Sequence, residues 1–187
     1  GTEKIIPGTV LPDEEQQLLD YYNAANQDGK IRIMEQAELL AAKGLAAEMK
    51  KELVENILPY WMRKMCNDEG GFYGRITGEE VLEPTAPVGG IMTARILWTF
   101  SQAYGAYGLD EYKMLADRAQ REIIYRFMDP TYGGLVWTIS PDGSILDGTK
   151  QTYCMAYGIY GLSEHFRVTG NKESLKAAIE IFNTLEE

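Results

Sequence analysis

A segment of this chain occurs twice, and the repeat restricts the fold more than any other feature. Residues 68–74 (DEGGFYG) correspond to 130–137 (PTYGGLVW), 96–104 (ILWTFSQAY) to 158–166 (GIYGLSEHF), and 111–119 (EYKMLADRA) to 173–181 (ESLKAAIEI). The offset is 62 or 63 positions throughout. Two helices and a connecting hairpin, repeated at a fixed spacing, indicate an array of helical hairpins that stack on one another.

The apolar spacing within each copy predicts a mainly α protein with short β-hairpins between the helices. We expect hairpins at GGFYGRI with EEVLEP, and at GGLVWTI with GSILDG around the turn SPDG. Pro59 lies inside the first predicted helix and should kink it or end it early. The predicted helices are 45–65, 93–108, 111–129, 152–170 and 173–187.

Residues 1–44 differ from the repeats and are predicted to form a separate N-terminal helical hairpin. Its first helix would cover 11–25, Asp28–Gly29 would form the turn, and Gly44 would cap the second helix. The predicted domains are therefore 1–44 and 45–187.

Three helical hairpins form an arc and cannot close a ring. Each hairpin buries its inner face only against its neighbours, so an incomplete toroid leaves apolar edges. We therefore expect either a fragment of a longer protein or a homo-oligomer that covers these edges.

The composition argues against several classes of partner. The formal net charge is −10, which disfavours nucleic acid and anionic membranes. No apolar run approaches the length of a membrane span. The two cysteines, Cys66 and Cys154, lie far apart in unrelated contexts, as expected for free thiols in a reducing cytoplasm.

Few residues suggest chemistry, and we predict neither a catalytic set nor a metal site nor a cofactor. The single histidine, His165, is expected to be a solvated or capping residue near a helix end. Arg95 is the exception, because it interrupts a predicted helix that is otherwise apolar. An arginine in such a place must either pair with a buried carboxylate or project into a polar cavity. Trp98 shares its helical face, and Tyr153 begins the corresponding helix of the second repeat. Arg95, Trp98 and Tyr153 could together bind a sugar.

The stretches NILPYWMRKMCNDEGGFYGRI, GGIMTARILWTFSQAY, DPTYGGLVWTISPDG and KQTYCMAYGIYGLSEHF resemble the N-acylglucosamine 2-epimerase / cellobiose 2-epimerase family. The resemblance covers about 45–187 in uninterrupted order and implies helical hairpins of an (α/α)6 barrel. It further implies epimerisation of a sugar at C2 by two acid–base histidines, without metal or redox cofactor. By the same resemblance, the substrate-contacting arginine of the A-R-I-L-W motif falls on Arg95, and the cleft tyrosine of K-x-x-Y-x-x-A-[FY] falls on Tyr153.

The catalytic histidines of that family have no counterpart among these residues, since His165 falls where the family commonly has an aromatic residue. The resemblance thus implies part of a substrate cleft and no activity for the isolated chain. Residues 1–44 are weakly similar to the helical tail of phage-repressor-like regulators, without a recognition helix. Two alternatives remain open: a non-catalytic, self-associating helical module, and a fragment of an α/α-barrel glycoside hydrolase with two carboxylates.

Overall fold

The computed structural model describes residues 27–186. The chain divides into two compact units, Gly1–Pro59 and Tyr60–Glu187, and each is described here by itself. The predicted first helix of the N-terminal hairpin, 11–25, lies outside the described residues. The predicted division between 1–44 and 45–187 stays a prediction.

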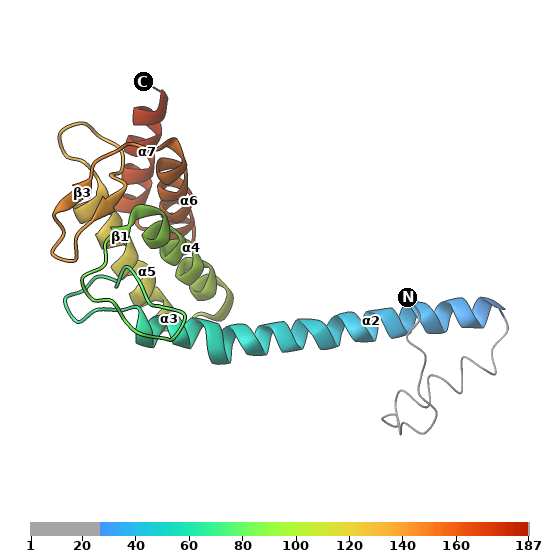
Figure 1. Ribbon diagram of the computed structural model, residues 1–187. Coiled ribbons are helices and arrows are strands. Elements are labelled where there is room, and N and C mark those ends of the chain that lie inside the picture. Colours follow the sequence, from blue (N-terminus) through green and yellow to red (C-terminus); the bar gives the residue numbers. More distant parts are fainter. Residues whose placement is uncertain (1–26, 187) are drawn as a thin grey trace. The chain divides into compact units, whose positions relative to one another are not determined.

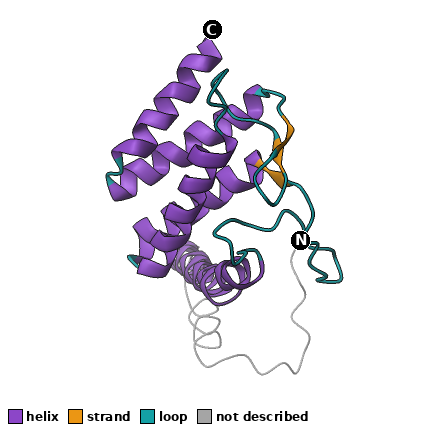
Figure 2. Ribbon diagram, turned by 90° about the vertical axis from the view of Figure 1, so that its left-hand side faces the viewer, coloured by secondary structure: helices purple, strands orange, loops and turns teal. Residues whose placement is uncertain are grey.

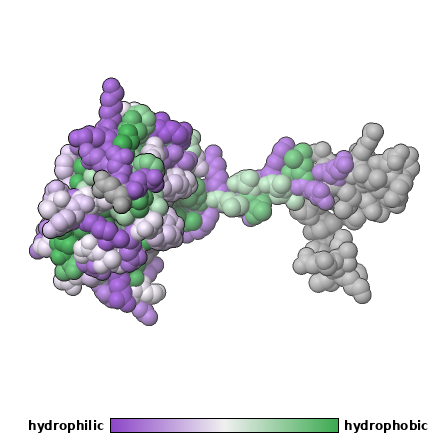
Figure 3. Space-filling view, turned by 90° about the horizontal axis from the view of Figure 1, so that it is seen from above, coloured by the Kyte–Doolittle hydropathy of each residue, from purple (hydrophilic) through white to green (hydrophobic). Residues whose placement is uncertain are grey.

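One long helix occupies the described part of the first unit. α2 (Gln27–Glu52) runs through Gly44, so the predicted helix end at this glycine is wrong, and Asp28–Gly29 lies in the first helical turn rather than between two helices. Alanine and leucine on both sides of Gly44 favour helix and outweigh the cost of about 1 kcal/mol that an interior glycine carries relative to alanine. Leu45 and Met49 are exposed along this helix, which forms the rod of Figure 3.

Pro59 changes the hydrogen bonding of the helix without ending it. The turn before it widens into the π-helical segment η1 (Leu53–Ile57), in which the Leu58 N–H donates to the Leu53 carbonyl. α-Helical bonding resumes as α3 (Leu58–Lys64). A proline cannot donate to the carbonyl four residues earlier and its ring crowds that carbonyl, so a local π-turn relieves both problems. The predicted early helix end is therefore wrong, and the predicted disturbance at Pro59 takes the form of this π-turn.

The second unit contains two helical hairpins of the same design. α4 (Gly90–Tyr107) packs against α5 (Asp110–Glu122), which continues as the π-turn η2 (Ile123–Phe127). α6 (Thr152–Thr169) packs in the same way against α7 (Lys172–Glu186). α4 and α6 lie side by side and join the two hairpins (Figures 1 and 2).

The helix boundaries confirm the repeat. α4 and α6 each contain 18 residues, and both ends of α6 lie 62 positions after those of α4. Each helix ends in a glycine in the left-handed region, Gly108 with φ 68° and Gly170 with φ 71°. Only glycine adopts this conformation without steric cost, and it lets the chain reverse into the second helix of each hairpin. We call α4 and α6 the inner helices and α5 and α7 the outer helices.

A glycine also brings the two inner helices close together. A Cβ atom on Gly161 of α6 would lie 2.7 Å from the carbonyl oxygen of Ala94 in α4. Leu97 of α4 is fully buried beside this contact. The short distance between α4 and α6 allows side chains one turn further along to meet across the two helices.

A small antiparallel sheet joins the beginnings of α4 and α6, in the order β1-β2-β3. The hairpin of β2 (Thr138–Ile139) and β3 (Ile145–Asp147) confirms the second predicted hairpin. β1 (Val88–Gly89) adds a third strand, with Val88 opposite Ile139. This pairing was not predicted, because nothing in the local sequence relates strands so far apart.

The first predicted hairpin is reduced to isolated bridges. Cys66 pairs with Phe72 and Ile76 pairs with Leu82, with no continuous strand between them. Pro84 and Pro87 follow directly and cannot donate to a strand partner, which prevents a longer ladder.

The core of the second unit lies between the inner and outer helices and under the hairpins. Burial of one such leucine or phenylalanine stabilises the fold by about 1.5–3 kcal/mol. The largest fully buried side chains of this unit are Phe72, Leu97, Phe100, Tyr112, Ile123, Phe127, Leu135, Ile139, Leu162, His165 and Ile181. Among the described residues, no helix combines the length and apolarity that a membrane crossing requires.

Candidate functional site

The aromatic residues of α4 and α6 meet on one partly exposed face. Trp98 of α4 stacks on Tyr160 of α6, with 5.0 Å between ring centroids and 16° between ring planes. The two residues occupy the same position in successive repeats, 62 residues apart. Their stacking follows directly from the close approach of the helices at Gly161.

Three tyrosines continue this face along α6. Tyr157 lies edge-on to Tyr160, with centroids 6.1 Å apart, and edge-on to Tyr153, at 4.9 Å. The Tyr153 hydroxyl donates to the Tyr157 hydroxyl over 3.3 Å. This hydrogen bond raises the pKa of the Tyr153 phenol, while the positive charge of Arg95 acts in the opposite direction. The Tyr153 phenol therefore keeps its proton at neutral pH. Because this proton is donated to Tyr157, the Tyr153 oxygen remains an acceptor and the Tyr157 hydroxyl remains a donor for a ligand.

Arg95 is exposed and forms no ion pair with the described residues. The predicted alternative, an arginine tied to a buried carboxylate, is therefore wrong for this part of the chain. The charge of Arg95 acts on Tyr153, one helix away. Its guanidinium thus remains available for a ligand with hydroxyl groups.

We call Arg95, Trp98, Tyr153, Tyr157 and Tyr160 the α4–α6 face. It contains a depression of about 300 Å³ lined by Tyr153, Ala156, Tyr157 and Tyr160, without an acidic side chain. Of the three residues singled out from the sequence, only Tyr153 lines this depression. Trp98 lies beside it by stacking on Tyr160, and the charge of Arg95 acts on Tyr153. Tyr157 and Tyr160 were missed, although the repeat offset would have found them, because it maps Arg95 onto Tyr157 and Trp98 onto Tyr160.

An ion pair holds the chain at the entrance to α6. The Lys150 ammonium donates to Asp129 Oδ2 over 2.6 Å, while Asp129 Oδ1 accepts from the backbone N–H groups of Thr131 and Tyr132. These bonds, first that of Lys150, lower the pKa of the Asp129 carboxyl to about 2. The ion pair thereby connects the loop before β2 to Lys150, which lies three positions before Tyr153.

His165 is buried, so the expectation of a solvated or capping histidine is wrong. Its Nδ1 lies 2.8 Å from Ser174 Oγ and its Nε2 lies 3.0 Å from Asp117 Oδ1. Because a carboxylate only accepts, Nε2 carries the proton and Nδ1 accepts from the serine hydroxyl. Burial lowers the pKa of His165, although Asp117 opposes the shift. This role could not be predicted from the local sequence, because both partners of His165 come from other helices.

These three residues do not form a nucleophilic triad. Ser174 and His165 both have no exposed surface, so no substrate reaches the serine oxygen. In the first repeat the corresponding positions hold Ala103 and Tyr112. A histidine–serine pair thus replaces an alanine–tyrosine pair at the same place between the helices, which indicates a packing role.

The described residues contain no group of three or more histidine, cysteine, aspartate and glutamate side chains suited to hold a metal ion. Cys66 and Cys154 are both free thiols, as predicted. Burial raises the pKa of the Cys154 thiol to about 11, so this thiol is not a nucleophile at neutral pH.

The repeated hairpins, with inner helices side by side and short β-hairpins leading into them, define the class: helical-hairpin repeats of the (α/α)6-barrel type. The family model of N-acylglucosamine 2-epimerase (GlcNAc 2-epimerase) matches residues 71–187, and the chain belongs to this family.

Named relatives agree with this assignment. A cellobiose 2-epimerase of Bacteroides fragilis is 51% identical over 143 residues, which are 76% of this chain and 36% of the relative. The solved cellobiose 2-epimerase of Spirochaeta thermophila is 38% identical, with a TM-score of 0.74 over 77% of this chain and 36% of that one. That of Bacillus thermoamylovorans is 34% identical, with a TM-score of 0.75 over 77% and 37%. The chain thus spans about a third of the length of these relatives.

Proposed function

We propose that the α4–α6 face is one wall of the sugar-binding cleft of a 2-epimerase. The observation that carries this proposal is the joint exposure of Arg95, Trp98 and Tyr153 on one face, with Tyr157 and Tyr160 between them. Aromatic rings bind the apolar faces of a sugar ring, and the guanidinium and phenol groups donate hydrogen bonds to its oxygens. The family match over 71–187 favours this function over the alternative of a glycoside hydrolase fragment.

The reaction that fits this family is epimerisation at C2 of a cellobiose-type or N-acylhexosamine sugar. Proton removal at C2 and its return on the opposite side need an acid and a base within hydrogen-bonding distance of the substrate. His165 cannot serve, because it is buried and occupied by Asp117 and Ser174. We therefore assign binding and orientation, and no proton transfer, to these residues.

Titration of the chain with cellobiose tests the proposal. We expect a saturable change of tryptophan fluorescence in the parent chain. Isothermal titration calorimetry, which does not need the indole as a reporter, should show about tenfold weaker binding after Trp98→Ala or Arg95→Ala, since each removes a stacking or charge-assisted contact. Tyr132→Ala is the matched control, because Tyr132 is 80% exposed and lies outside the face. The same samples should contain no C2 epimer of cellobiose after long incubation. An affinity for cellobiose that neither substitution changes would rule out this face as the binding site.

The homo-oligomer expected from the sequence also stays a proposal. Leu175, Ile179 and Phe182 form an apolar stripe along α7, with 36%, 51% and 50% of their surfaces exposed. A second copy that packs on this stripe would remove it from water. Light scattering should show a dimer or larger species that Ile179→Glu dissociates, and a monomer at all concentrations would contradict self-association. The two free thiols are consistent with a cytoplasmic location.

A further inference from the structure

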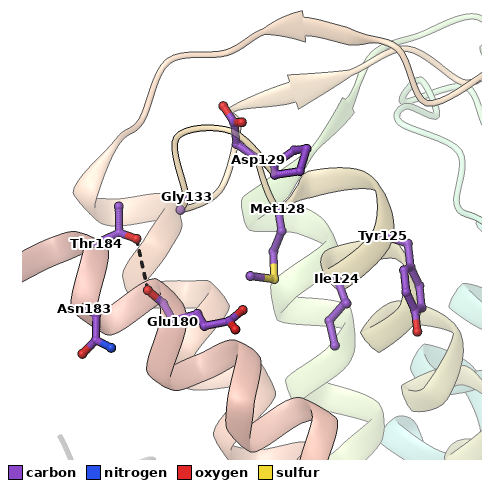
Figure 4. A pocket seen from close by; sticks show the side chains of 10 residues that line it. Ile124, Tyr125, Met128, Asp129, Gly133, Glu180, Asn183 and Thr184 are labelled. Atoms are coloured by element: carbon purple, nitrogen blue, oxygen red, sulfur yellow. Dashed lines mark hydrogen bonds between the residues drawn. The ribbon is translucent and has the colours of Figure 1, made fainter.

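A second pocket lies away from the α4–α6 face, between α7 and the loop that precedes β2. Its volume is about 570 Å³. Figure 4 shows the Glu180 side chain reaching from α7 into the space below Met128, with Ile124 and Tyr125 on the opposite side. The lining residues are Ile124, Tyr125, Met128, Asp129, Pro130, Gly133, Gly134, Glu180, Asn183 and Thr184.

The first repeat shows what fills the equivalent place. There, Arg118 of α5 reaches the loop after α3 and donates through Nη1 to two backbone carbonyls, Asn67 O at 3.0 Å and Gly71 O at 3.1 Å. Its guanidinium also lies beside Cys66 and lowers the pKa of that thiol against the larger effect of burial. In the first repeat, an arginine side chain thus occupies this position between the helix and the loop.

The second repeat keeps the loop but not the arginine. The position equivalent to Arg118 holds Glu180. The backbone bond that closes the loop is retained, from Asp129 N to Gly134 O at 3.0 Å, where the first repeat has Asn67 N to Gly71 O at 3.1 Å. The Asp129 carbonyl differs from that of Asn67, because it already accepts from the Gly133 N–H at 3.0 Å. The carbonyls of Asp129 and Gly134 therefore each have one lone pair left for a further donor, and the pocket holds a carboxylate in place of the arginine.

The partners of the two acidic residues leave Glu180 open to a cation. Asp129 is engaged by Lys150 and by two backbone N–H groups. Among the described residues, the Glu180 carboxylate forms an ion pair with Lys176 alone, at 3.5 Å, and the Lys176 side chain is 78% exposed. An exposed pair of this kind contributes little and exchanges readily.

We propose that this pocket binds a guanidinium group. Glu180 accepts two of its N–H groups, and the carbonyls of Asp129 and Gly134 accept others, as the carbonyls of Asn67 and Gly71 accept from Arg118. A planar fork of five donors matches this divided set of acceptors better than an ammonium group does. The apolar stem of an arginine would lie along Met128 and Ile124.

Amide chemical-shift titrations test the ligand class. N-acetyl-L-arginine amide should shift the amides of Gly133, Gly134 and Thr184 saturably, while the neutral isostere N-acetyl-L-citrulline amide should not. N-acetyl-L-lysine amide should bind at least several-fold more weakly. Unblocked L-arginine and the peptide acetyl-Gly-Arg-Gly-amide separate the free amino acid from an arginine side chain within a protein: tighter binding of the peptide identifies a protein partner, and tighter binding of L-arginine identifies the free amino acid. Citrulline or lysine binding as strong as arginine binding would overturn the proposal.

Two substitutions complete the test. Glu180→Gln should weaken arginine binding about tenfold, because it removes the charge from the hydrogen bonds. Glu180→Arg should abolish binding and raise Tm by about 2–4 °C, because the new side chain would reproduce the bonds of Arg118. Glu79→Arg, the same charge change on an exposed loop, should do neither. Unchanged binding in Glu180→Arg, or an equal rise of Tm in Glu79→Arg, would contradict the assignment.

Discussion

Replacement of His165 by alanine should lower the free energy of unfolding by about 2–4 kcal/mol at neutral pH. The side chain has no exposed surface, and its removal leaves a cavity between α5, α6 and α7. It also leaves the buried Ser174 hydroxyl without its partner. Urea unfolding at pH 7.5 measures the loss, and Ser163→Ala on the exposed side of α6 should stay within about 0.5 kcal/mol of the parent.

The first repeat supplies the compensating change. Its Ala103 and Tyr112 occupy the positions of His165 and Ser174. Ser174→Tyr should therefore destabilise the parent chain by overpacking, but restore part of the stability lost in His165→Ala. Equal effects of Ser174→Tyr in both backgrounds would show that the two sites are independent and would contradict this packing.

The loss should also depend on pH. Burial holds the pKa of His165 below its ordinary value of 6.5, so the unfolded chain binds the proton more tightly than the folded one. The parent therefore loses stability as the pH falls through 6.5 toward the folded-state pKa. The stability of the His165→Ala variant lacks this pH dependence. The difference in free energy of unfolding between parent and variant should therefore be smaller at pH 5.5 than at pH 7.5.

Replacement of Arg126 by methionine should cost about 2–4 kcal/mol at neutral pH. Arg126 Nη1 donates to both oxygens of Glu122, at 3.1 and 3.3 Å, and the Glu122 side chain is only 8% exposed. Its Nη2 donates to Pro141 O in the β2–β3 turn. A Cβ atom on Gly143, where φ is 89°, would lie 2.6 Å from Arg126 Nε, so the turn rests directly on the guanidinium.

Most of this cost arises from the carboxylate that is left buried. The double variant Glu122→Gln/Arg126→Met should therefore recover much of the loss, while Arg121→Met on the exposed side of α5 should change little. Burial already raises the pKa of Glu122 against the effect of Arg126, and removal of Arg126 should raise it further. The folded variant then binds the proton more tightly than the unfolded chain, so its deficit should shrink as the pH falls toward 4.5. A deficit that is constant between pH 7 and 4.5 would contradict this account.

The repeat made most of the second unit predictable. The apolar spacing and the repeat offset predicted the helices at 93–108, 111–129, 152–170 and 173–187, which the structure shows as α4 to α7. The capping glycines Gly108 and Gly170 were not predicted, although they occupy the same position in the two repeats. Local signals failed where a longer context overrode them: Gly44 lies inside a helix because its neighbours favour helix strongly. β1 could not be predicted, since its partner, β2, lies about fifty residues later.

The candidate site was predictable in part for the same reason. Arg95 interrupts a predicted apolar helix and Trp98 follows it by three residues, so both could be identified from the local sequence. Tyr160 could have been found through the repeat offset from Trp98, but its stacking on Trp98 follows only from the packing of α6 beside α4. His165 could not be assigned, because its two partners come from α5 and α7 and no local pattern brings them together.

The most direct test of the account is to map cellobiose on the folded chain by amide and side-chain NMR shifts. If the α4–α6 face is one wall of a sugar-binding cleft, cellobiose will cause saturable chemical-shift changes at the residues of this face: Arg95, the Trp98 indole, Tyr153, Tyr157 and Tyr160. The pocket at Glu180 will remain unshifted. Saturable shifts elsewhere, or none at concentrations that saturate a weak sugar site, would contradict it.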